Sequence, residues 1–222
     1  MLILPHLNNS RSQRILWLLE ELGIPYEIKK YERTTQQLAP PELLEISALG
    51  KAPIITDGDV TLAESGAIIE YLITRYGNGK GVPTESGYLD NLYFSHYAEG
   101  SLMPILVQKV IFDIVPKNSP FLIRPLVKSI FEKLDSQLVQ NELKKHFSMI
   151  EAHLAKSPSG WFAGGQEPTA ANYQMSFPLE AVVADAPEMA GPQIKKFVQI
   201  VHNREAFKKA LERGGEYSYA RL

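Results

Sequence analysis

The chain has 222 residues, of which 45% are hydrophobic and 22% are charged, and its formal net charge at pH 7 is -2. This length and composition are typical of a globular protein with one large domain or two smaller ones, and the near-neutral charge without a basic tract argues against nucleic acid as a partner. The chain has no cysteine, which excludes disulfides, thiolate metal sites and a protein thiol nucleophile.

The first third of the chain predicts alternating strands and helices. Residues 2–4 are a short apolar strand ended by Pro5. Residues 15–22 carry apolar side chains at helical spacing up to Gly23, which suits the end of a helix. Residues 26–30 read as a second strand, and the helix between the two strands makes them parallel.

The following residues complete this first unit. Residues 40–47 predict a short helix that begins at two prolines. Two short apolar runs, residues 52–56 and 60–62, flank Asp57-Gly58 and predict a hairpin. Residues 63–76 predict a helix. The order β-α-β-α-β-β-α indicates a mixed four-stranded sheet.

The second half predicts helices and no strand. A linker rich in glycine and proline separates it from the first half, so we expect a domain at residues 1–77, a linker at 78–86 and a helical domain at 87–222. The predicted helices cover residues 88–112 with a kink at Pro104, residues 126–154, a segment starting at Thr169, and residues 192–211. Pro116, Pro120 and Pro125 predict a break between the first two.

Other kinds of site find little support in the sequence. The five histidines form no zinc-binding pattern, so we expect no metal. No apolar run approaches the ~20 residues of a membrane span, and the apolar start at residues 1–4 is too short for a signal peptide. We therefore expect a cytoplasmic protein without membrane insertion.

Four stretches in succession resemble the glutathione S-transferase family. They are SRSQRILWLLEELGIPYEI from Ser10, ALGKAPII from Ala48, LAESGAIIEYL from Leu62 and YAEGSLMPIL from Tyr97. The first and last are similar to a serine-type, cysteine-free branch found in yeasts and bacteria. The resemblance covers essentially the whole chain. It implies an α+β fold, in which a thioredoxin-like glutathione-binding domain precedes an all-α helical bundle.

Polar residues crowd the start of the first predicted helix, where they either cap the helix or hold a ligand. The resemblance implies that Ser10 donates a hydrogen bond to the sulfur of glutathione and, with the helix N-terminus, favours the thiolate. Asn8, Asn9 and Ser12 are close enough to compete, and we rank Ser10 ahead of Asn9 and Ser12. The alternative is that Ser10 only caps the helix.

Two arginines belong to the same stretch. Arg11 is predicted to line the site. Arg14 fits the arginine that relatives carry four residues after the serine, and we expect it to make a structural ion pair between the domains.

The resemblance also implies a binding site for the glutathione peptide. Ala52 precedes a predicted cis Pro53 and offers its backbone N–H and C=O to the ligand; the alternative is a trans proline that begins an edge strand. Ser65 and Glu64, at a helix N-terminus, bind the α-carboxylate and the ammonium group, unless they only cap that helix. Lys51 is a candidate for the glycine carboxylate, or a solvated surface charge.

The helical half contributes further candidates. Tyr93, His96, Tyr97 and Met103, together with Asn9, are predicted to line a pocket for the second substrate, although core and dimer-contact roles explain the same spacing. By resemblance, an acid at the place of Glu99 reaches glutathione in the other subunit of a homodimer.

One departure from the family pattern concerns a buried helix of this half. Asn172 stands where relatives place an aspartate three residues after Thr169. Asparagine keeps the acceptor that a capping box needs but loses the charge. The fold is expected to survive this change.

These features predict a homodimeric glutathione transferase that uses glutathione as co-substrate. Glutathione would be activated as a thiolate and would attack a small apolar electrophile. Two alternatives remain open: a glutathione-dependent peroxidase, and a non-catalytic glutathione-fold protein with a binding or regulatory role. The sequence does not identify the electrophile.

Overall fold

The computed structural model describes residues 1–220, and its N-terminal part is built on one four-stranded sheet. The strands are β1 (Leu2–Leu7), β2 (Tyr26–Tyr31), β3 (Ile54–Asp57) and β4 (Val60–Ala63), in the order β2-β1-β3-β4. β1 and β2 are parallel, and the other two pairs are antiparallel. The predicted mixed sheet and thioredoxin-like topology are confirmed.

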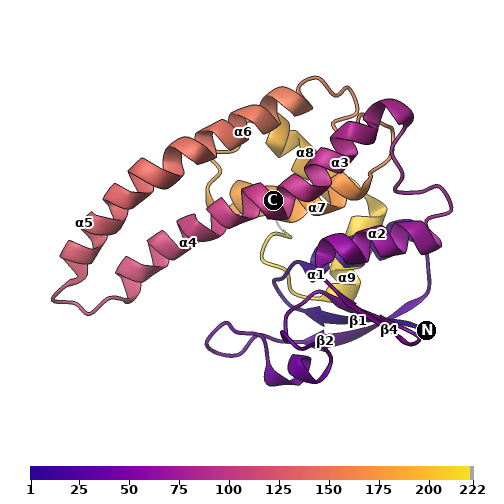
Figure 1. Cartoon of the computed structure of the whole chain (residues 1–222), viewed down its shortest axis with the longest axis horizontal. Helices are drawn as coiled ribbons and strands as arrows, with labels where there is room; N and C mark the ends of the chain where they lie inside the picture. Colours follow the sequence, from indigo (N-terminus) through magenta and orange to yellow (C-terminus); the bar gives the residue numbers. More distant parts are fainter. Residues whose placement is uncertain (221–222) are drawn as a thin grey trace.

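Two helices cover this sheet. Helix α1 (Ser12–Leu22) and helix α2 (Ser65–Tyr76) lie between the sheet and the helices of the second half (Figure 1). Gly23 ends α1 in the left-handed conformation that glycine adopts without strain, and its N–H bonds to Leu19. The short predicted helix at residues 40–47 is a 3₁₀ turn, Pro41–Glu45.

β1 continues through Pro5 and His6 to Leu7, beyond its predicted end. The reason is the pairing on its two sides. β1 pairs with β2 along its whole length, but with β3 only at Leu2 and Ile3. At Pro5 the strand therefore has a neighbour on one side only, and a proline without an N–H is tolerated there.

The second half of the described chain contains helices only, in agreement with the prediction. They are α3 (Tyr88–Tyr97), α4 (Met103–Asn118), α5 (Arg124–Leu134), α6 (Gln140–Leu154), α7 (Ala170–Asp185), α8 (Pro192–Asn203) and α9 (Glu205–Gly214). Figure 1 shows α4 and the line of α5 and α6 as a long antiparallel hairpin that projects from the rest of the molecule. The domain boundaries at residues 77 and 87 stay a prediction.

The predicted break between α4 and α5 is present and contains Pro120, but Pro116 and Pro125 lie within the two helices. α4 runs through Pro116 to Asn118, and α5 starts at Arg124 with Pro125 in its first turn. A proline is tolerated in the first turn of a helix because the N–H of that position has no partner in any case. The chain turns only at Ser119, where the backbone becomes extended.

Three predicted helices are interrupted, and the one predicted at residues 126–154 is divided by a π-helical turn, Asp135–Val139, between α5 and α6. The first is divided by a π-helical turn, Ala98–Leu102, just before Pro104. The last is divided at Arg204, whose backbone is extended and whose side chain bonds to Glu21 and Glu167. These partners are distant in the chain, so helical periodicity alone could not place the break.

The buried helix α7 begins with the predicted capping box. Asn172 Oδ1 accepts hydrogen bonds from the Thr169 N–H at 2.9 Å and from the Thr169 hydroxyl at 3.1 Å. The amide oxygen thus serves as the acceptor that the capping box needs.

The core joins the two halves around one tryptophan of α1. Trp17 is fully buried, and its ring lies 4.5 Å from that of Tyr173, 6.0 Å from Phe207 and 6.5 Å from Trp161, measured between centroids. All three partners belong to the C-terminal half. The contact fixes α1, and therefore the loop before it, against the helical half.

Candidate functional site

The predicted catalytic serine lies in a cavity of about 540 Å³, which we call the Ser10 cavity. Its walls include Ser10, Arg33, Lys51, Ala52 and Phe177, from the segments after β1 and β2, the segment before β3, and α7. Of the remaining predicted residues, Asn9 and Arg11 also line it, whereas Glu64 and Ser65 do not.

The Ser10 side chain is 6% exposed and makes three local hydrogen bonds. Its hydroxyl donates to the Leu7 carbonyl at 2.7 Å and accepts the Ser12 N–H at 3.2 Å. It also lies 2.7 Å from the Ser12 hydroxyl. The bond from the Ser12 N–H reaches the first residue of α1, so Ser10 holds the start of this helix and also lines the cavity.

Ser12 lies behind Ser10, away from the cavity, and is fully buried. Its hydroxyl is 2.7 Å from His6 Nδ1 and 3.1 Å from the Leu7 carbonyl. Burial and the charge of Lys30 lower the pKa of His6 to about 4, so this imidazole is neutral at physiological pH. Sequence patterns gave no reason to connect His6 with the site.

The two asparagines beside Ser10 hold other parts of the chain. Asn8 Oδ1 accepts the Arg33 N–H at 3.0 Å. Asn9 has a left-handed backbone, with φ +48°, and its Oδ1 accepts from the N–H and the hydroxyl of Ser218 at 2.7 and 2.8 Å. The oxygen atoms of both side chains are therefore engaged within the described protein.

Cationic side chains dominate the polar lining. Arg11, Arg33 and Lys51 all border the cavity, and no described lining residue is acidic. Arg33 Nη2 donates to the Asn9 carbonyl at 3.0 Å, which holds its guanidinium at the cavity. Burial, and then repulsion from Arg11, lower the pKa of Arg33 below its ordinary value. Arg33 was missed in the sequence, where its only signal is a basic residue shortly after the second strand.

The segment before β3 and the start of α2 have unusual backbones. The Ala52–Pro53 peptide bond is cis, as predicted. Glu64 has φ +72° at the position before α2, and its side chain caps nothing. A glutamate in this region is strained by about 1–3 kcal/mol, and such strain is concentrated at functional sites.

A buried arginine connects α1, α2 and the helical half. Arg14 Nη1 donates to Glu99 Oε1 at 2.7 Å, to Ser65 Oγ at 3.2 Å and to Gln174 Oε1. Arg11 Nε donates to both oxygens of Glu99, at 2.9 and 3.0 Å. Burial raises the pKa of Glu99, but the charges of Arg14 and Arg11 outweigh it and hold that pKa below its ordinary value. The predicted ion pair of Arg14 between the two halves is confirmed.

The aromatic residues predicted for the second substrate border a different cavity. Tyr93, His96 and Tyr97 line a cavity of about 670 Å³ along α3, and it shares no lining residue with the Ser10 cavity. Tyr93 and Tyr97 stack at 5.5 Å between centroids, and Met103 is buried and lines neither cavity. Their predicted role with the second substrate stays a prediction.

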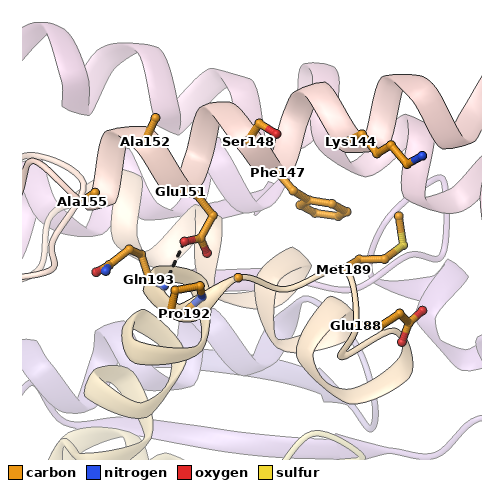
Figure 2. Close-up of a pocket in the computed structure, with 11 residues that line it drawn as sticks. Lys144, Phe147, Ser148, Glu151, Ala152, Ala155, Glu188, Met189, Pro192 and Gln193 are labelled. Carbon is orange, nitrogen blue, oxygen red and sulfur yellow. Dashed lines mark hydrogen bonds between the residues drawn. The ribbon is translucent and has the colours of Figure 1, made fainter.

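A larger cavity, of about 880 Å³, lies between α6 and the start of α8, away from Ser10. Figure 2 shows Glu151 of α6 pointing at that helix start. Its carboxylate accepts the Gln193 N–H at 3.0 Å and the Ile194 N–H at 2.8 Å. Glu151 is therefore engaged in holding the start of α8.

The described part of the chain holds neither a metal-binding cluster nor a membrane-spanning helix. Residues 1–220 contain no group of three or more His, Asp or Glu side chains arranged to hold a metal ion. None of the helices in this part of the chain combines the length and apolar character needed to cross a bilayer.

Comparison with known proteins gives consistent matches. The sequence profile described as "Glutathione S-transferase, N-terminal domain" matches residues 2–74. Glutathione S-transferase 3 of Schizosaccharomyces pombe is 37% identical over 216 residues, 96% of this chain and 88% of the relative. Glutathione S-transferase 1 of Saccharomyces cerevisiae is 30% identical over 93% of this chain and 92% of the relative.

Solved structures agree with the fold. A glutathione S-transferase from Actinobacillus pleuropneumoniae is 28% identical, with a TM-score of 0.75 over 100% of this chain and 97% of that one. A family member from Pseudomonas fluorescens, solved with two glutathione molecules bound, is 24% identical with a TM-score of 0.74. It covers 95% of this chain, and at this identity it supports the fold alone.

Proposed function

Because this chain belongs to the glutathione S-transferase family, we propose that it binds glutathione in the Ser10 cavity and activates the thiol as a thiolate. The yeast relatives identify the protein as an enzyme, a glutathione transferase. The thiolate would attack a small apolar electrophile. The electrophile itself is left open.

The observation that carries this proposal is the chemistry of the cavity. A hydroxyl, Ser10, stands beside the start of α1, and the cations Arg11, Arg33 and Lys51 surround it without an acid. Glutathione carries a thiol and a glycine carboxylate, which complement a hydroxyl and cations of this kind. The thiol is assigned to Ser10 and the glycine carboxylate to Lys51.

The activation step needs no protein nucleophile. The thiol proton passes to solvent water, the Ser10 hydroxyl donates to the resulting sulfur anion, and the N-terminus of α1 adds positive potential. Such environments lower the pKa of a thiol from about 8.5 to roughly 3.5–7.5. The sulfur then forms a bond to the electrophilic carbon, and the leaving group departs with the bonding electrons.

The start of α2 supports a site for the γ-glutamyl end. Free N–H groups at a helix start bind carboxylates, and Ser65 lies there, 3.2 Å from Arg14 Nη1. Glu64 would pair with the ammonium group. Ala52, before the cis bond to Pro53, would pair its backbone with the cysteinyl part of glutathione.

Two substitutions of Glu64 separate the contribution of its carboxylate to binding from the effect of its strained backbone on stability. Glu64→Gly removes the carboxylate and the strain at φ +72°, whereas Glu64→Ala removes only the carboxylate. Both variants are expected to bind glutathione several-fold more weakly in calorimetric titration. In urea denaturation, Glu64→Gly is expected to be more stable than Glu64→Ala by about 1 kcal/mol. Unchanged affinity in both variants would remove Glu64 from the site.

The function is tested by an ultraviolet titration of glutathione into the pure protein. Thiolate absorbance is followed with pH at saturating protein. A bound thiol that ionises at least one pH unit below free glutathione supports the proposal. Binding without this shift would contradict thiolate activation and favour a non-catalytic binding protein, and absence of binding would contradict the whole proposal.

We also propose that the protein forms a homodimer. α4 exposes several apolar side chains, among them Val110, Ile111 and Ile114, which are 52%, 49% and 47% exposed. An apolar face of this kind is typical of an interface. Glu99 already pairs with two arginines of its own chain, so a reach into the partner's site would require it to leave one of them.

A further inference from the structure

The Ser10 hydroxyl is the outer end of a buried chain of polar groups. Ser10 Oγ lies 2.7 Å from Ser12 Oγ, which lies 2.7 Å from His6 Nδ1. Both hydroxyls also reach the Leu7 carbonyl, at 2.7 and 3.1 Å. Ser12 is fully buried and His6 is 3% exposed, so water has little access to this chain.

The number of hydroxyl hydrogens limits what Ser10 can donate to at one time. Each hydroxyl carries one hydrogen, and the Leu7 carbonyl, 2.7 Å from Ser10 Oγ, is placed to accept that of Ser10. A hydrogen held there cannot also be donated to a sulfur atom. If Ser10 turns away, the Leu7 carbonyl loses a donor in a buried place, which costs about 1–3 kcal/mol unless another donor replaces it.

Ser12 is that other donor, provided that its own hydrogen does not point at His6. This depends on which ring nitrogen of the neutral His6 carries the hydrogen. Within residues 1–220, the side-chain hydrogen bond of His6 is made by Nδ1, with Ser12. A hydrogen on Nε2 would make no hydrogen bond within the described protein, whereas a hydrogen on Nδ1 is donated to Ser12 Oγ.

We propose that Ser12 and His6 are positioning residues that free the Ser10 hydroxyl for the sulfur of glutathione. His6 Nδ1–H donates to Ser12, Ser12 donates to the Leu7 carbonyl, and Ser10 then turns its hydrogen to the sulfur. This inference rests on the proposed function. No proton leaves any of the three side chains, and the thiol proton passes to solvent water as before.

The test removes each hydrogen-bond donor in turn and measures the pKa of the bound glutathione thiol. Ser12→Ala abolishes the replacement donor but keeps the backbone N–H that caps through Ser10. We expect the bound thiol to ionise about one pH unit higher than in the unsubstituted enzyme. Turnover with a chloronitroarene should then fall about tenfold at pH values below that midpoint. The affinity for S-methylglutathione, which has no thiol, should change less than twofold.

Two variants of His6, one with a hydrogen-bond donor and one without, form a matched pair. The Nδ2–H of asparagine can occupy the place of Nδ1–H, so His6→Asn is expected to keep the low thiol pKa. His6→Leu has no donor and should behave as Ser12→Ala does. Ser95→Ala in α3 is the control, because it loses one side-chain hydrogen bond, to the Asn91 carbonyl, far along the chain from the cavity.

The outcomes separate this inference from the function on which it rests. If the unsubstituted enzyme shows a lowered thiol pKa and both Ser12→Ala and His6→Leu keep it, the positioning role is wrong and the function stands. If the unsubstituted enzyme shows no lowering, the proposed function itself fails. Should Ser12→Ala not fold, as judged by circular dichroism, the His6 pair decides, and equal thiol pKa values in its two members would overturn the inference.

Discussion

Ser10→Ala is expected to lower turnover with a chloronitroarene by about 10- to 30-fold at pH 7, because a thiol with an unperturbed pKa of about 8.5 is only about 3% thiolate there. The dissociation constant of glutathione should change little, because the peptide contacts are assigned to other residues. Steady-state kinetics and calorimetric titration on the same preparations measure the two quantities.

The pH dependence of this loss follows from its cause. Ser10 acts by lowering the thiol pKa, so its benefit exists only where the thiol in the variant is still protonated. Above about pH 8.5 the thiol ionises without help, and the two enzymes should converge. Equal turnover of Ser10→Ala at pH 6.5 would contradict the role of Ser10. Asn9, whose amide nitrogen can donate, would then be the next candidate.

Arg14→Met is expected to reduce the free energy of unfolding by about 3 kcal/mol, at the low end of the range for breaking a buried ion pair. The Arg14 side chain is completely buried and donates to Glu99, Ser65 and Gln174 at the contact between α1, α2 and the helical half. Its loss leaves these acceptors with fewer donors. Urea denaturation followed by tryptophan fluorescence measures the change.

Arg11→Met is the matched control, because it removes a second arginine from the same acid. The Arg11 side chain is 35% exposed, and exposed pairs contribute only about 0.2–1 kcal/mol. A stability loss for Arg11→Met equal to that for Arg14→Met would show that burial does not decide the contribution of this pair.

Several site features could be predicted because they depend on neighbours in the chain. A serine before an apolar helix is placed at the helix start by local structure, and Ser10 accordingly accepts the N–H of Ser12, the first residue of α1. The Thr169–Asn172 capping box was also predicted from four consecutive residues. The cis bond at Pro53 followed from the resemblance of the surrounding motif.

Other features depend on residues that meet only after folding. Asn9 was a candidate for the sulfur, but its side-chain oxygen holds Ser218, more than 200 residues later. Glu99 was assigned a reach to the other subunit, yet it pairs with Arg11 and Arg14 of its own chain. Arg33 joins the cavity wall because its guanidinium bonds to the Asn9 carbonyl.

The sequence by itself determined the order of strands and helices, the mixed sheet and the place of Ser10, because hydrophobic periodicity and capping act over a few residues. Only the tertiary structure decided that Arg14 is the buried arginine, that the last helix breaks at Arg204, and that His6 and Ser12 stand behind Ser10. Each of these depends on burial and on hydrogen-bond partners. Both are created when distant segments pack together and exclude water.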